Sequence, residues 1–289
     1  MVFGFGQNLV LQRLKFFTEN CCYFDRYILP YYTILLYNTH DPLFSDARVR
    51  MALTHAIDRE YIVREILKGS GKVANGPMGV ESPYHNPEVK PLPYDPKKAL
   101  ALLERAGWSH HQDDHYLFRS GKSFAFTMLI FRESQVDKNV AQYIRLCLDE
   151  IGIKMKVEEL FFEELKSRYF RNTQFQAVLT EIADTNYNPE SLKLLWSSDI
   201  HWGKSIAGCF EHPEVTCLLQ RACEAQSSSP AQSALFYQAE ARIVSLQPGT
   251  FLFQKEAIDV LSKRFDLSSP FRLNYAGIYD LQHASLKTH

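Results

Sequence analysis

The chain has 289 residues, of which 46% are hydrophobic, 13% aromatic and 22% charged. This composition is typical of one or two globular domains and excludes a disordered or low-complexity chain. The 32 lysines and arginines against 33 aspartates and glutamates leave a formal charge of −1, which argues against a nucleic-acid partner because phosphates require a basic surface. No apolar run reaches the roughly 20 residues that a membrane-spanning helix needs.

The first residues, MVFGFGQNLVLQRLKFF, resemble a signal peptide only superficially. Their apolar stretch is interrupted by five polar residues, and no small-x-small cleavage site follows. We therefore expect no signal peptide in this chain.

Six cysteines leave the disulfide status open, because six could form three bridges. They are Cys21, Cys22, Cys147, Cys209, Cys217 and Cys223. No C-x-x-C pair occurs, and a chain of this size does not need disulfides to fold, so reduced thiols are expected.

In the first half of the chain, the pattern predicts one strand and three helices. Residues 1–33 are rich in aromatics without a clean period, and no element is assigned to them, whereas residues 33–38 indicate a buried strand. Each helix follows a potential N-cap: Ser45 or Asp46, Asp58, and Asp95, which precedes a proline. A proline-rich loop over residues 76–93 separates the second helix from the third.

The second half alternates strands and helices. Strands are predicted at residues 124–131, 153–160 and 175–182, with helices at 140–151 and 163–170 between them. Short links in such an alternation indicate a parallel sheet with right-handed crossovers. Two more helices, at 213–225 and 230–245, and a final strand at 250–253 complete an α/β domain.

Two ordered sequence blocks carry a resemblance to a known family. The first is YNTHDPLFSDARVRMALTHAIDREYIVREILKGSGKVANGP, and the second is YDPKKALALLERAGW; VAQYIRLCLDEIGIKMKV and HPEVTCLLQRACEA follow in the same order. From about residue 37 to residue 253 the chain resembles family 5 extracytoplasmic solute-binding proteins, the peptide/nickel class that serves ABC importers.

The resemblance implies a bilobed, periplasmic-binding-protein-like (type II) clamp that holds its ligand between two α/β lobes. The matching part is the C-terminal lobe, expected to be a mixed sheet flanked by helices, with the first lobe missing. Residues 1–36 stay unassigned, residues 37–254 form the lobe, and residues 255–289 form a tail that in the family returns to the first lobe.

By the same resemblance, the chain is the substrate-binding component of an ABC importer that takes up oligopeptides or dipeptides outside the cytoplasmic membrane. Its partners are then a peptide, a membrane permease and a separate first-lobe polypeptide; no cofactor is implied. Two alternatives stay open: a ligand-sensing or interaction domain without transport, and a truncated remnant that binds nothing by itself.

Five residues are candidates for contacting a ligand. Arg132 directly follows a predicted strand at the carboxyl edge of the sheet, where ligands collect. The resemblance implies that Arg132 anchors a peptide carboxylate and that Asp184 receives the ammonium, while Tyr187, Asn188 and Trp196 line a side-chain pocket. The structural alternatives are a solvated arginine, an aspartate that forms an Asx-turn, and a tryptophan packed in the core.

Other motifs do not point to a metal site or an enzyme. The cluster His110-His111-Gln112-Asp113-Asp114-His115 could bind surface ions, but a polar loop is favoured because it lacks a separated further ligand. GSGK at residues 69–72 lacks the glycine spacing and the Ser/Thr of a phosphate-binding loop. No nucleophile or zinc-protease motif is present, so we expect no catalysis.

Overall fold

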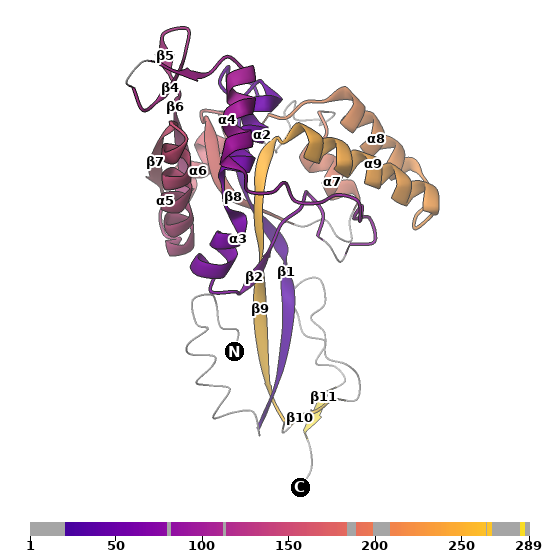
Figure 1. Ribbon diagram of the computed structural model, residues 1–289. Helices are drawn as coiled ribbons and strands as arrows, with labels where there is room; N and C mark the ends of the chain where they lie inside the picture. Colours follow the sequence, from indigo (N-terminus) through magenta and orange to yellow (C-terminus); the bar gives the residue numbers. More distant parts are fainter. Residues whose placement is uncertain are drawn as a thin grey trace.

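The computed structural model describes residues 21–79, 82–111, 114–183, 189–198, 209–263, 265–267 and 284–286. Within them, helices cover both faces of a mixed sheet of order β2-β9-β1-β8-β6-β7 (Figure 1). Its strands are β1 (Cys22–Tyr37), β2 (Gly71–Val73), β6 (Ala125–Phe131), β7 (Lys154–Leu160), β8 (Ala177–Ala183) and β9 (Gly249–Ser262).

The described helices are α2 (Ala47–Ala56), α3 (Arg59–Tyr61), α4 (Pro96–Arg105), α5 (Gln135–Glu150), α6 (Phe162–Lys166), α7 (Pro189–Trp196), α8 (Pro213–Glu224) and α9 (Pro230–Leu246). Two π-helical turns, Ile62–Ile66 and Ser167–Arg171, continue α3 and α6. Strands β3 (Ser109–His110), β4 (Leu117–Arg119) and β5 (Lys122–Ser123) form a small sheet, and β10 (Phe265–Leu267) pairs with β11 (Ala284–Leu286). No helix of the described ranges is long and apolar enough to cross a bilayer.

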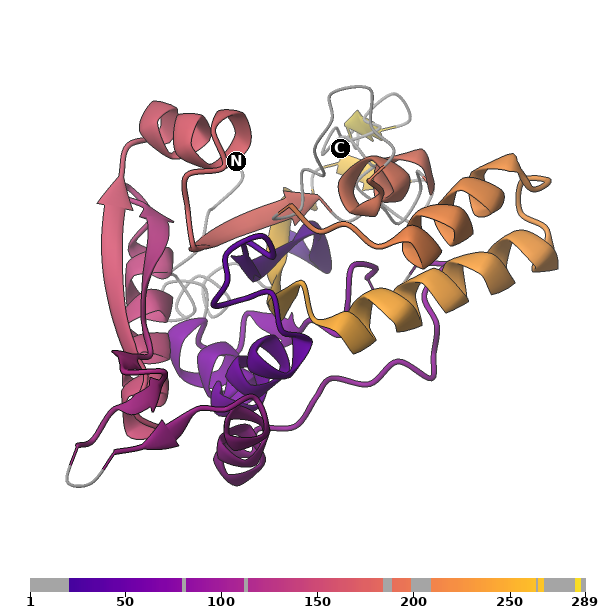
Figure 2. The same ribbon diagram turned by 90° about the horizontal axis from the view of Figure 1, so that it is seen from above.

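The predicted α/β fold with a mixed sheet is confirmed. Strand β6 runs parallel to both β7 and β8, as the strand–helix alternation indicated, while β1 is antiparallel to β8 and β9. The side chains of β1 alternate between two cores: Ile34 packs toward α7, α8 and α9, and Leu35 packs toward α2, α4 and α5. Figure 2 shows α8 and α9 side by side on one of these faces.

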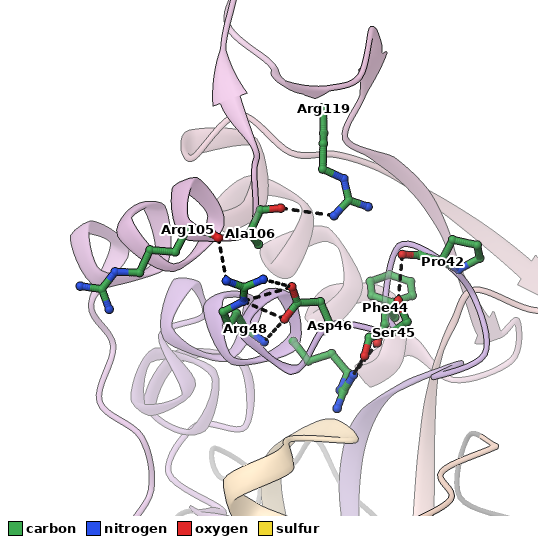
Figure 3. A network of polar contacts seen from close by, with 9 residues as sticks. Pro42, Phe44, Ser45, Asp46, Arg48, Arg105, Ala106 and Arg119 are labelled. Atoms are coloured by element: carbon green, nitrogen blue, oxygen red, sulfur yellow. Dashed lines mark hydrogen bonds and ion pairs between the residues drawn. The ribbon is translucent and has the colours of Figure 1, made fainter.

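Residues of the first sequence block cap the N-termini of helices. Asp46 caps α2, because its carboxylate accepts a hydrogen bond from the backbone N–H of Arg48 at 2.8 Å and also pairs with the Arg48 guanidinium (Figure 3). Arg48 in turn donates to the carbonyl of Arg105 at the end of α4, at 2.7 Å. Asp58 and Asp95 cap α3 and α4, so all three predicted caps are confirmed.

Two buried arginines of the same block bind backbone carbonyls. Arg50 donates to the carbonyls of Gln247 and Leu246, at 2.8 and 2.7 Å, where α9 ends. Arg59 donates to the carbonyl of Phe251 in β9 at 2.9 Å and also to that of Leu92 in the proline-rich loop. These arginines tie the first helices to the last helix and strand, which explains structurally why the block contains them.

The structure differs from the prediction in the length of two strands. β1 begins at Cys22 rather than at residue 33, and β9 continues to Ser262 rather than ending at residue 253. The two strands pair from Cys22 opposite Ser262 to Ile28 opposite Glu256, and again from Tyr32 opposite Gln254 to Leu36 opposite Gly249. They extend beyond the helices as a ribbon (Figure 1). The register shifts between Ile28 and Tyr32 and again between Thr33 and Ile34. Helix α7 was also not predicted.

Candidate ligand-binding edge of the sheet

The carboxyl ends of the parallel strands β6, β7 and β8 meet at one edge of the sheet. Arg132 follows β6 directly, and Phe161 follows β7. The segment after β8 contains three of the predicted site residues, Asp184, Tyr187 and Asn188, which lie outside the described residues. Ligands of open α/β sheets collect at such an edge.

Arg132 is exposed at this edge and is held by its backbone. Its N–H donates to the carbonyl of Leu160 at 2.9 Å, which extends the ladder between β6 and β7. Its guanidinium carbon lies 4.9 Å from the centroid of the Phe161 ring. No carboxylate of a described residue forms an ion pair with Arg132, so nothing described neutralises its charge.

Two phenylalanines beside Arg132 were not predicted as site residues. Phe161 and Phe162 are 55% and 58% exposed, and Phe162 contacts Phe131 with ring centroids 6.3 Å apart. Exposed neighbouring aromatics on a rigid edge favour contact with an apolar group. The only sequence signal was the pair of phenylalanines immediately after a strand.

A charged cluster lies where α5, β8 and β9 meet. Lys255 of β9 donates to the carboxylate of Glu181 in β8. Burial raises the pKa of Asp137, in the first turn of α5, to about 6, while the contact of its carboxyl with the Ser134 side chain and the charge of Lys255 oppose that shift. Sequence reasoning missed this cluster because its members come from three distant segments.

Trp196 lies in the core in this structure. Its side chain is wholly buried, and its ring centroid is 5.9 Å from that of Phe251 and 6.0 Å from that of Phe210. The structure therefore shows a packing role for Trp196 and does not bring it to the position of Arg132.

A polar cavity of about 490 Å³ opens beside the start of β8, next to the middle of β6 and β7. Its lining includes a pair of Glu158 and Arg168, 2.7 Å apart, and a hydrogen bond from Gln176 to Asp41 at 3.3 Å. Asn38, His40, Thr127, Leu129, Thr173, Gln174 and Phe175 complete the lining. Arg132 and Trp196 are not part of it.

Within the described ranges, no group of three or more histidine, cysteine or acidic side chains could hold a metal ion. Of the histidine cluster, His115 instead contacts the carbonyl of Asp149 at the end of α5, at 2.6 Å, and Gln112 and Asp113 lie outside the described residues. None of the six cysteines, all of which lie in the described ranges, forms a disulfide.

The chain is similar in sequence to proteins that have been characterised. Residues 18–203 match the profile of the bacterial extracellular solute-binding proteins, family 5 middle region. The oligopeptide-binding protein AppA of Bacillus subtilis is 31% identical over 228 residues, which are 77% of this chain and 41% of that protein. The nickel-binding periplasmic protein of Escherichia coli is 28% identical over 172 residues, 59% of this chain and 32% of that protein.

The solved structure of Bacillus subtilis AppA in complex with a nonapeptide has the same fold. Its TM-score is 0.80 at 24% identity, over 97% of this chain and 55% of that chain. The chain thus spans about half the length of the proteins it matches, or less. This coverage is consistent with a single lobe.

Proposed function

The chain belongs to family 5 of the bacterial extracellular solute-binding proteins, and from this we propose that it is the ligand-clamping lobe of the substrate-binding component of a peptide importer. Family 5 consists of binding proteins rather than enzymes and works outside the cytoplasmic membrane. The chain then holds a peptide and releases it to an ABC permease.

One observation supports the peptide assignment most. Arg132 presents a guanidinium at the carboxyl edge of the sheet, beside the ring of Phe161 and without a described carboxylate partner. A guanidinium matches a carboxylate in a two-pronged, charge-assisted geometry, so Arg132 suits the C-terminal carboxylate of a peptide.

The other end of the peptide needs a negative charge. Asp184 comes directly after the last residue of β8 in the sequence, and we assign it to the α-ammonium group. Tyr187 and Asn188 then contact the peptide between its ends.

A single lobe covers one side of a peptide. We therefore propose that a first lobe, as a separate polypeptide, closes over the edge that carries Arg132. The β1–β9 ribbon extends beyond the helices, which makes it the natural connection to such a lobe (Figure 1).

This function can be tested by calorimetric titration of the chain with short peptides. The peptides have either a free or an amidated C-terminus. We expect the free acid to bind about 10–100-fold more tightly than the amide, because a charge-assisted contact contributes roughly 1.5–3 kcal/mol. Arg132→Ala should abolish that preference, and Arg132→Lys should keep part of it.

Arg145→Ala is the matched control, because Arg145 is exposed on α5 and hydrogen-bonds to Gln142 on the same helix. Asp184→Asn should abolish the preference for a free over an acetylated N-terminus. Equal affinity of the wild-type chain for acid and amide would refute the role of Arg132. The absence of any peptide binding, with or without the first lobe, would refute the peptide function itself.

A further inference from the structure

Two adjacent cysteines lie at the far end of the β1–β9 ribbon, away from Arg132 and the sheet edge. Cys22 begins β1 and pairs with Ser262, and the carbonyl of Cys21 accepts a hydrogen bond from the N–H of Lys263 at 2.7 Å. Both backbones are thus fixed to β9. Cys21 is exposed and Cys22 is half-buried, so solvent ions can reach the pair.

The two sulfurs face each other. Consecutive side chains of a strand point to opposite faces, but Cys21 precedes the strand, and the distance between the Sγ atoms is only 3.8 Å. Two sulfurs that bind one tetrahedral zinc ion at ~2.3 Å are also about 3.8 Å apart. The thiols therefore have the spacing of two ligands of one ion before any ion arrives.

A disulfide fits this geometry less well. An S–S bond is about 2.05 Å long, and disulfide-linked residues usually have Cα atoms about 4.4–6.8 Å apart. Adjacent residues are held about 3.8 Å apart by the trans peptide, and no peptide bond among the described residues is cis. Chelation needs no change of this spacing, whereas oxidation would draw the sulfurs together by more than an ångström.

We propose that Cys21 and Cys22 form a two-thiolate chelating site for a soft divalent cation such as Zn²⁺. On binding, each thiol gives its proton to solvent, two sulfur–metal bonds form, and nothing is oxidised or reduced. The pair supplies two of the four ligands that a tetrahedral ion takes.

Titration of the reduced, full chain with Cd²⁺ tests this site, because cadmium–thiolate bonds give an ultraviolet charge-transfer absorption in proportion to the sulfurs bound. The wild-type chain should show a saturable band at one ion per chain. Cys21→Ser and Cys22→Ser should each remove the saturable band, and Zn²⁺ should compete for it.

The matched control is Cys217→Ser, which removes an exposed thiol on α8 and should leave the band unchanged. Circular dichroism confirms that each variant is folded, so a lost band reports on the ligands alone. A wild-type chain without a saturable band, or a band that survives in the Cys21→Ser/Cys22→Ser double variant, would overturn the proposal.

Discussion

Arg50 brings a positive charge into the interior at the point where α9 ends. Its side chain is 4% exposed, and burial lowers its pKa to about 10, which still leaves it charged near neutral pH. Its partners are backbone carbonyls rather than a carboxylate. The last carbonyls of a helix carry partial negative charge, so they compensate the buried cation directly.

Replacing Arg50 should therefore be costly. We expect Arg50→Ala to lower the free energy of unfolding by about 3 kcal/mol or more, because several buried carbonyls lose a charged donor together. The surface pair of Arg48 and the half-buried Asp46 provides the comparison, and Arg48→Ala should cost far less than Arg50→Ala. Urea denaturation of both variants measures the difference, and equal costs would contradict the assignment.

The raised pKa of Asp137 makes stability depend on pH. An unfolded aspartate titrates near 3.8, and burial holds the folded pKa at about 6, so the folded state binds the proton more tightly. The free energy of unfolding should consequently fall as pH rises between these two values, by up to about 3 kcal/mol.

Asp137→Asn should remove this loss, so the variant gains stability over the wild-type chain near neutral pH and not near pH 4. Thermal unfolding at both pH values measures the gain. Glu150→Gln, an exposed change at the other end of α5, is the control. A gain of the same size at both pH values would show that the effect does not come from ionisation.

At the scale of the elements, local signals predicted the helices well. Asp46, Asp58 and Asp95 act within one turn of their own helices, so the sequence next to each of them was sufficient. The ribbon was not predicted, because Pro30 argues against a strand and its partner β9 lies more than 200 residues away along the chain.

At the candidate edge, too, local sequence was sufficient to predict one feature but not the contacts between distant segments. Arg132 could be placed because a parallel strand ends immediately before it. The contact between Phe161 and Arg132, and the meeting of Asp137 with Lys255, depend on how separate segments pack. Sequence periodicity reports which face of an element is buried and not which distant element covers it.

For the whole molecule, the described structure divides into a packed lobe and a ribbon. In the lobe, β1 has neighbours on both sides, β8 and β9, from Tyr32 to Leu36. In the ribbon, residues 22–28 pair with β9 alone. A two-stranded ribbon is only marginally stable by itself, so the two halves of one strand should differ in protection.

Hydrogen exchange measured by mass spectrometry tests this difference. We expect amides of residues 22–28 to exchange much faster than those of residues 33–37, because opening the ribbon breaks one ladder and leaves both cores intact. Residues 177–183 of β8 serve as a protected reference. Equal protection of the two halves would mean that a further segment covers the ribbon.

The register shift near Pro30 sits at the junction of lobe and ribbon. Proline supplies no N–H to a ladder, and a bulge increases local bending and twist without breaking the pairs on either side. The ribbon is thus joined to the lobe through a break in the ladder between Ile28 and Tyr32. A change of backbone angles at this break would turn the ribbon relative to the lobe, so its direction would change while the arrangement of Arg132 and Phe161 stays as it is.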